Sequence, residues 1–169
     1  MNIAIIDFDR TLFDTERHVK DLCEALCIDK LELYERLDEL ADHSDVQPFF
    51  RNIRQYMFKE WDEAIATLRE KYDSVILLTK ACHGYHWQHQ KIAASNIKDF
   101  VDTVIITERS KKFDVEEIIE RTGATEIVFI NDRVNENAEI EEFLPQVKVI
   151  EIDNYSEHPT EGRLALSDI

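Results

Sequence analysis

Two aspartates, separated by one residue, follow the first apolar run of the chain. Residues 3–6 predict a buried strand, and Asp7 and Asp9 come directly after it. Ligands of parallel α/β sheets bind beyond the carboxyl ends of the strands, and alternation along an extended chain sends both side chains to one side. Two neighbouring carboxylates repel each other, which raises the pKa of one of them unless a cation neutralises the pair. The spacing therefore suits metal binding or acid–base catalysis; the alternative interpretation is a strand that ends in an acidic turn.

Polar side chains that suit a phosphate group follow two more apolar runs. Thr79 and Lys80 come directly after residues 75–78, and Lys111 and Lys112 stand in a polar segment after the third run. A hydroxyl next to an ammonium group can hold phosphate oxygens, and either of the two later lysines can add positive charge. A plain strand end and a solvated pair of lysines are the alternative interpretations of these segments.

Oxygen donors follow the fourth apolar run. Asn131 and Asp132 come directly after residues 127–130, and Glu136 stands four residues beyond Asp132. Hard oxygen ligands of this kind suit Mg²⁺, which keeps several water molecules and takes only one or two carboxylates from a protein. If the four runs lie in one parallel sheet, all of these side chains meet at the same edge.

Five short runs rich in Ile and Val indicate the fold that must position these residues. Four are almost continuously apolar, as strands buried on both faces of a parallel sheet are, and the fifth alternates more and is expected at an edge. Segments with helical periodicity lie between them, and Gly123 marks a helix end. The pattern predicts an α/β fold, a Rossmann-like three-layer sandwich with a parallel sheet. The runs are residues 3–6, 75–78, 104–106, 127–130 and 147–152.

An insert of about 45 residues breaks this alternation. Residues 15–59 follow the first strand and carry helical periodicity over 16–27 and again over 30–41. We expect a small helical cap here, inserted between two parts of the core, residues 1–14 and 60–153. The polar tail, residues 154–169, contains Pro159 and Gly162 and is expected to be loosely held.

The composition favours a soluble protein of the cytoplasm. The net charge of −16 arises from 36 acidic and 20 basic residues, and such a surface repels nucleic-acid backbones and anionic membranes. No apolar run approaches the roughly 20 residues that span a bilayer. The three cysteines are an odd and sparse set, which indicates reduced thiols rather than a disulfide framework. We therefore expect neither nucleic acid nor a membrane as a partner, and a phosphate site must build its own positive charge.

The order of these motifs resembles that of the haloacid dehalogenase superfamily, over residues 3–153 without the insert. The first motif, Asp-x-Asp-x-Thr after an apolar strand, is matched by residues 7–11. The second, a Ser or Thr that ends the next strand, is matched by Thr79. The third, a lysine ahead of a helix, is matched by Lys112, because Lys112-Phe113-Asp114 resembles the Lys-Pro-Asp often seen there; Lys111 stays the alternative. The fourth, usually Gly-Asp-x-x-x-Asp, corresponds to residues 131–136.

The resemblance implies a phosphatase that uses Mg²⁺ and hydrolyses a small-molecule phosphate monoester through an aspartyl-phosphate. Asp7 would attack phosphorus, and Asp9 would protonate the leaving oxygen and then act as a base toward water. Magnesium would be held at Asp7, Asp9 and Asp132, through the backbone carbonyl in the case of Asp9, with Glu136 behind them. The residues that would hold the phosphate group are Thr79, Lys80 and the catalytic lysine Lys112.

Three departures from the family pattern concern these motifs. Arg10 replaces the usual glycine, so the turn after Asp9 must avoid positive φ or tolerate strain. Asn131 also replaces a glycine, and Asn is the residue that best accepts left-handed geometry in its place. Glu136 replaces an aspartate and is longer by one methylene, so its contact with the metal could run through water. None of the three removes a charge that the chemistry needs.

A cluster of possible metal ligands follows Thr79. If one helix carries them all, His83, His86 and His89 lie on neighbouring faces at spacings of three, which could bind a transition metal. Cys82 precedes them, but the spacing fixes no fourth ligand. A contact with substrate and a helix without special function are the two other interpretations.

Other functions compete with the phosphatase. A phosphotransferase of the same superfamily would use the same residues, and a non-catalytic binding protein could keep the fold. A dehalogenase is disfavoured because those enzymes usually lack an acid at the position of Asp9. The sequence does not name the substrate.

Overall fold

A five-stranded parallel sheet forms the centre of the protein, whose computed structural model describes residues 1–156 and 163–169. The strands lie in the order β3-β2-β1-β4-β5, and every neighbouring pair is parallel. The predicted α/β fold with a parallel sheet is confirmed, and the fifth run is an edge strand. The strands are β1 (Asn2–Ile6), β2 (Ser74–Lys80), β3 (Thr103–Thr107), β4 (Glu126–Asn131) and β5 (Val147–Glu151).

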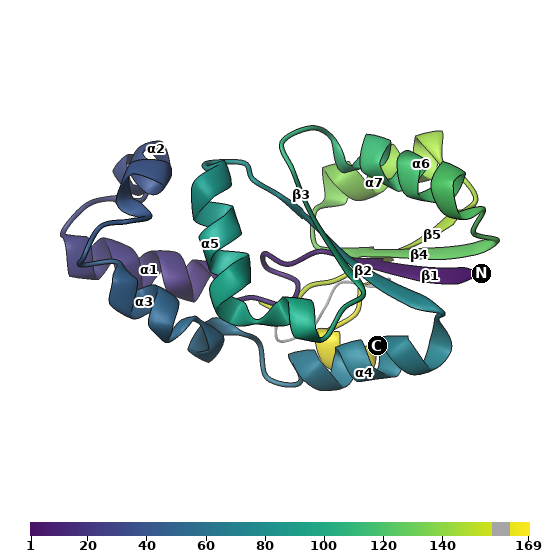
Figure 1. The fold of residues 1–169 in the computed structure, drawn as a ribbon, viewed down its shortest axis with the longest axis horizontal. Helices are drawn as coiled ribbons and strands as arrows, with labels where there is room; N and C mark the ends of the chain where they lie inside the picture. Colours follow the sequence, from purple (N-terminus) through teal and green to yellow (C-terminus); the bar gives the residue numbers. More distant parts are fainter. Residues whose placement is uncertain (157–162) are drawn as a thin grey trace.

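Helices cover both faces of the sheet (Figure 1). Side chains alternate along β1, so Ile3 and Ile5 join one apolar cluster, while Ala4 and Ile6 join the other. The first cluster contains the buried faces of α6 and α7, and the second those of α4 and α5. Those helices are α4 (Trp61–Lys71), α5 (Tyr85–Ser95), α6 (Lys111–Thr122) and α7 (Val134–Phe143), with short 3-10 turns η2 (Ile97–Asp99) and η3 (Leu166–Asp168).

The insert forms helices that pack at one end of the sheet, against α5 (Figure 1). The Asp14 carboxylate accepts a hydrogen bond from Arg17 N at 3.1 Å and so caps the first of these helices. Leu33 and Phe50 are buried, and the Phe50 ring lies 4.8 Å from that of Trp87 on α5. The apolar residues of the insert therefore continue the cluster that covers the α4–α5 face of the sheet. The elements are α1 (Thr15–Leu26), α2 (Lys30–Leu40), α3 (Gln47–Arg51) and η1 (Ile53–Tyr56).

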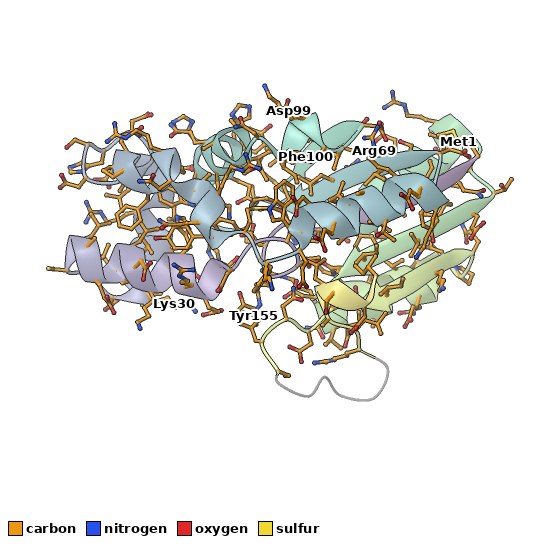
Figure 2. All side chains as sticks on the ribbon, turned by 90° about the horizontal axis from the view of Figure 1, so that it is seen from below. Met1, Lys30, Arg69, Asp99, Phe100 and Tyr155 are labelled. Atoms are coloured by element: carbon orange, nitrogen blue, oxygen red, sulfur yellow. The ribbon has the colours of Figure 1, made fainter. Side chains whose placement is uncertain are left out.

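The described part of the tail packs on the core, so the prediction that it is loosely held is wrong for those residues. Asn154 Nδ2 donates to the carbonyl oxygens of Arg10 and Thr11, at 3.1 and 2.8 Å. Leu166 is buried in the core beside α4, and Tyr155 lies at the junction between α1 and the sheet (Figure 2). Residues 157–162, which include Pro159 and Gly162, lie outside the described residues. The polar composition of the tail does not indicate these contacts, because only a few of its residues make them.

Among the described residues, none of the helices combines the length and the apolar character needed to cross a membrane.

Candidate active site

Asp7 lies at the carboxyl end of β1, in the middle of the sheet. Its backbone N donates to the carbonyl of Ile130 at 2.9 Å, which fixes it beside the end of β4. Its side chain is buried, and Lys111 Nζ lies 2.7 Å from its Oδ1. Burial raises the pKa of Asp7 to about 7; the charge of Lys111 opposes this rise, and those of Asp132 and Asp9 add to it. A further cation at this edge would therefore favour the ionised, nucleophilic form.

The lysine at Asp7 is Lys111, which corrects the prediction of Lys112. Lys111 Nζ lies 3.1 Å from Glu136 Oε2 and donates to Asn131 Oδ1 at 3.1 Å, and its side chain is 2% exposed. Lys112 points to the neighbouring helix instead, where its Nζ lies 3.2 Å from Glu139. Consecutive residues on a helix point about 100° apart, so only one of the two can face the sheet edge.

Helical phase could have identified this lysine from the sequence. Lys111 precedes the buried residues Val115 and Ile118 by four and seven positions, so it belongs to the buried face of α6. Lys112 falls outside that face. The prediction of Lys112 followed the resemblance of Lys112-Phe113-Asp114 to a family motif, although the helical phase of α6 favours Lys111.

The motif after β4 places Asp132 and Glu136 near Asp7. Asn131 ends the strand without positive φ, so its role is not that of a left-handed substitute for glycine. Its buried amide donates to Asn137 Oδ1 at 3.0 Å and accepts from Lys111, which holds the lysine in place. Glu136 contacts Lys111. Asp132 Oδ1 is buried and has no hydrogen-bond partner among the described residues.

Arg10 occupies a left-handed conformation, with φ at 63°. The turn after Asp9 thus tolerates strain of about 1–2 kcal/mol rather than avoiding it. Two acids and a ring hold the side chain: Arg10 Nε lies 3.0 Å from Asp132 Oδ2, Nη1 lies 2.6 Å from Glu16 Oε1, and the guanidinium lies 5.1 Å from the ring centre of Tyr155. Those contacts offset the strain and tie the loop after β1 to three other parts of the chain.

The carboxylate of Asp9 is held by three donors. Lys91 Nζ lies 2.5 Å from Oδ1, Thr15 Oγ1 donates to the same oxygen at 2.9 Å, and Gln88 Nε2 donates to Oδ2 at 2.7 Å. Burial alone would raise the pKa of Asp9, but Lys91, Gln88 and Thr15 hold it below its ordinary value. The prediction of Asp9 as a metal ligand is therefore restricted to its backbone carbonyl, because the side chain is engaged elsewhere.

Gln88 and Lys91 are site residues that the sequence prediction missed. They stand three apart on α5 and are both buried, so one helix face presents both to Asp9. Their signal in the sequence is two long polar side chains at helical spacing, close to Ile92 in a helix that must cover the sheet. The neighbouring histidines in the same segment suggested a metal site instead.

Thr79 and Lys80 lie at the same edge, as predicted for the end of β2. Thr79 is fully buried, and its Oγ1 accepts a hydrogen bond from Gln88 Nε2 at 2.7 Å. Gln88 thus connects Thr79 with Asp9 through a single amide nitrogen. Lys80 is half-buried. Both side chains line the cavity that Asp7 and Asp9 also line.

This cavity of about 210 Å³ lies between the sheet edge and the insert. The catalytic candidates Asp7 and Asp9, together with Lys111, line it from the side of the sheet. Asp132 and Glu136 line a separate depression beside it, and Arg10 and Arg133 border both. The residues of the insert that line the cavity are Thr15, Glu16, His18, Val19, Leu22, Lys30, Tyr34 and Leu37.

The histidines after Thr79 do not share one helix, because α5 begins only at Tyr85. The ring of His83 stacks on that of Tyr34 at 4.3 Å, and His86 Nε2 lies 3.0 Å from Asp42 of the insert. His89 is exposed. Throughout the described residues, no three His, Cys, Asp or Glu side chains are grouped so that they could hold a metal ion. His83 and His86 instead connect α5 and its preceding loop with the insert.

The arrangement at the ends of β1 and β4 nevertheless fits Mg²⁺. A buried carboxylate oxygen without a partner, such as Asp132 Oδ1, is costly unless a ligand satisfies it. Asp7 is a second carboxylate, and the carbonyl of Asp9 is a third hard oxygen donor. Because Mg²⁺ needs only one or two carboxylates and retains water, this set suffices without a third acidic side chain.

Solved structures share the fold over almost the whole chain. A haloacid dehalogenase-like protein from Burkholderia xenovorans gives a TM-score of 0.66 at 16% identity, over 98% of this chain and 93% of that one. A family enzyme from Bacteroides thetaiotaomicron, in complex with magnesium and inorganic phosphate, gives 0.55 at 15% identity, over 93% and 96%. The L-2-haloacid dehalogenase from Xanthobacter autotrophicus, with chloropropionic acid covalently bound, gives 0.60 at 13% identity, over 93% and 79%.

No protein-family model and no curated protein matches the sequence. The evidence for a shared fold is therefore the architecture. The parallel sheet in the order β3-β2-β1-β4-β5, the helical segment after β1 and these superpositions agree with one another. The chain has the fold of the haloacid dehalogenase-like hydrolases.

Proposed function

We propose that the protein is a magnesium-dependent hydrolase of small phosphate monoesters that works through an aspartyl-phosphate on Asp7. The observation that carries this proposal is the buried carboxylate of Asp7, which faces a cavity of about 210 Å³ and has Lys111 Nζ at 2.7 Å. A carboxylate at the end of a central strand is positioned to attack an electrophile in the cavity. The magnesium and phosphate bound in the Bacteroides enzyme support the same chemistry by analogy of fold.

The first step forms a bond between an oxygen of Asp7 and phosphorus and breaks the bond from phosphorus to the ester oxygen, which leaves with the electron pair. Lys111 orients the nucleophile and offsets negative charge on the phosphoryl oxygens. Thr79 and Lys80 line the cavity where those oxygens would lie. Lys111 takes the role first assigned to Lys112.

In the second step a water oxygen bonds to phosphorus, and the bond from phosphorus to the Asp7 oxygen breaks, which releases inorganic phosphate and restores the Asp7 carboxylate. Asp9 is the base that accepts a proton from this water. The three donors around Asp9 favour its anion, which is the form a base needs. The proton that Asp9 accepts from water is then available for the leaving oxygen of the next ester. The donors around Asp9 favour its release, because they hold the pKa of this carboxyl below its ordinary value.

Asp7, Asp132 and the carbonyl of Asp9 would hold Mg²⁺. When bound, the ion supplies positive charge next to the phosphate group and keeps Asp7 ionised. Glu136 would not be a direct ligand of the ion, because its carboxylate is paired with Lys111.

The insert is the proposed cap of this active site. It lines the cavity with Val19, Leu22 and Leu37 and with the polar side chains of α1 and α2. A cap excludes water and shapes specificity. The small cavity volume favours a leaving group of modest size, so the proposed partner is a small-molecule phosphate ester.

The test is hydrolysis of p-nitrophenyl phosphate with Mg²⁺ and with a chelator. Asp7→Asn should abolish turnover, whereas Asp62→Asn, an exposed aspartate on α4, is the matched control and should retain it. Release of chloride from 2-chloropropionate, measured in parallel, distinguishes a dehalogenase. Turnover by Asp7→Asn at the wild-type rate, or chloride release without phosphatase activity, would overturn the proposal.

A further inference from the structure

A chain of alternating charges connects Asp132 with the insert. Arg10 Nε lies 3.0 Å from Asp132, Arg10 Nη1 lies 2.6 Å from Glu16, and Lys30 Nζ lies 3.1 Å from the second oxygen of Glu16. Asp132 follows β4, Arg10 follows β1, Glu16 belongs to α1, and Lys30 begins α2. Four elements are thus connected by three ion pairs.

The two acids that Arg10 contacts differ in burial. The side chain of Asp132 is 11% exposed, whereas those of Arg10 and Glu16 are 42% and 41% exposed. Coulomb interactions are stronger where water is excluded, so the charge of Arg10 acts mainly on Asp132. Arg10 engages only Oδ2 of Asp132, and Oδ1 keeps no partner among the described residues. One guanidinium is therefore shared between a buried acid, which can bind a metal, and an exposed acid of the insert.

We propose that Arg10 sets the affinity of Asp132 for a divalent cation, and that Glu16 tunes this affinity by taking a share of the charge of Arg10. The inference rests on the metal site of the proposed function. A guanidinium next to a ligand repels the incoming ion and competes for the electron density of the carboxylate, so Arg10 weakens binding. Glu16 draws the same guanidinium toward the insert and so restores part of the affinity.

The backbone at Arg10 is also held by contacts that do not involve its side chain: Arg10 N donates to the carbonyl of Phe13 at 2.8 Å. Asn154 Nδ2 binds the carbonyl of Arg10, and the residue keeps a φ of 63°. Replacement by glycine would relieve this strain and change two properties at once. Arg10→Gln keeps the Cβ and the strain and removes the positive charge, so a change in backbone strain does not confuse its effect.

The experiment is calorimetric titration of the protein with Mg²⁺ alone, without substrate. We expect Arg10→Gln to tighten binding about tenfold and Glu16→Gln to weaken it several-fold. The double variant should match Arg10→Gln, because Glu16 acts only through Arg10. Glu24→Gln is the matched control on the same helix: it lies outside the chain of charges and should bind as the wild type does.

Two outcomes would overturn the coupling alone: weaker or unchanged binding in Arg10→Gln, or unchanged binding in Glu16→Gln. Since Glu16 is half-exposed, its variant gives an independent result even if Arg10→Gln does not fold. Asp132→Asn should remove binding in the same titration. If the wild type does not bind Mg²⁺, or if Asp132→Asn binds as well as the wild type, the metal site of the proposed function is wrong and the coupling with it.

Discussion

Lys91→Met should destabilise the protein strongly at neutral pH, because it leaves Asp9 as a buried charge without a cation. Lys91 and Asp9 are 6% and 22% exposed, and their charged atoms lie 2.5 Å apart. Removal of one partner of such a buried pair typically costs about 3–5 kcal/mol. Asp9 keeps the hydrogen bonds of Gln88 and Thr15, so we expect the lower end, about 3 kcal/mol. Methionine has an unbranched chain of similar length, but it also removes the ammonium that lies 5.7 and 5.2 Å from the ring centres of Phe8 and Phe13.

The loss should depend on pH. In the wild type the pKa of Asp9 is lowered, so its contribution to stability is present above the ordinary value of 3.8 and lost as pH falls through the folded value. Without Lys91, burial raises the pKa of Asp9. The Asp9 carboxyl of the variant therefore takes up a proton already in mild acid, which removes the cost of a buried charge without a cation. The difference in free energy of unfolding between wild type and variant should therefore be largest at pH 7 and shrink toward pH 4.

Urea unfolding followed by circular dichroism at both pH values measures this difference. Lys91→Arg keeps a cation and should recover part of the loss, and Asp9→Asn in the Lys91→Met background should recover more, because no unpaired charge remains. Lys98→Met replaces an exposed lysine just beyond the same helix and serves as the control. A loss below about 1 kcal/mol, or one of equal size at both pH values, would refute the reasoning.

Three other predictions follow from the site and the tail. Lys111→Met should reduce kcat for p-nitrophenyl phosphate by at least about 100-fold, whereas Lys112→Met should change it less than about threefold; equal losses would restore Lys112 as the catalytic lysine. Mg²⁺ binding should tighten as pH rises from 6 to 8 and should release a proton, because burial raises the pKa of Asp7 to about 7 and a metal ligand must be ionised. Calorimetry in buffers of different ionisation enthalpy measures the released proton. Binding without proton release would contradict the raised pKa of Asp7. Asn154→Ala should cost about 1–3 kcal/mol in urea unfolding, since two carbonyls of the loop after β1 lose their donor; an unchanged midpoint would show that the tail contributes nothing there.

The fold could be predicted because burial on both faces leaves a clear pattern in the sequence. The run at residues 127–130 is continuous in Ile, Val and Phe, and it forms most of β4, an interior strand between β1 and β5. Gly123 ends α6 in the left-handed conformation, as its position after the last periodic residue predicts. These features depend on the local composition and on the helical periodicity of apolar residues. Both properties can be read from the sequence without three-dimensional information.

The site was predicted less completely because its contacts depend on helix phase and on distant partners. Asp7 follows β1 and Thr79 is the second-last residue of β2, so their places come directly from the strand ends. Lys111 required the phase of α6, which the sequence contains but a motif obscured. Lys91 and Asp9 are 82 residues apart in the sequence, and no local pattern predicts which acid a buried lysine will contact. The ion pair of Arg10 with Asp132 is of the same kind, since it depends on the adjacency of β1 and β4.

The apolar cluster that runs from the sheet into the insert limits how the active site can open. Phe50 and Leu33 of the insert belong to the same cluster as Trp87 of α5 and Ile6 of β1. A rigid-body swing of the insert would separate these side chains and expose them to water, at about 25 cal/mol for each Å² of apolar surface. Substrate entry should therefore proceed through small movements of the polar rim, around Lys30 and Tyr34, while the buried part of the insert stays in place. The rate of exchange with solvent would then be set by side-chain rotation rather than by hinge motion.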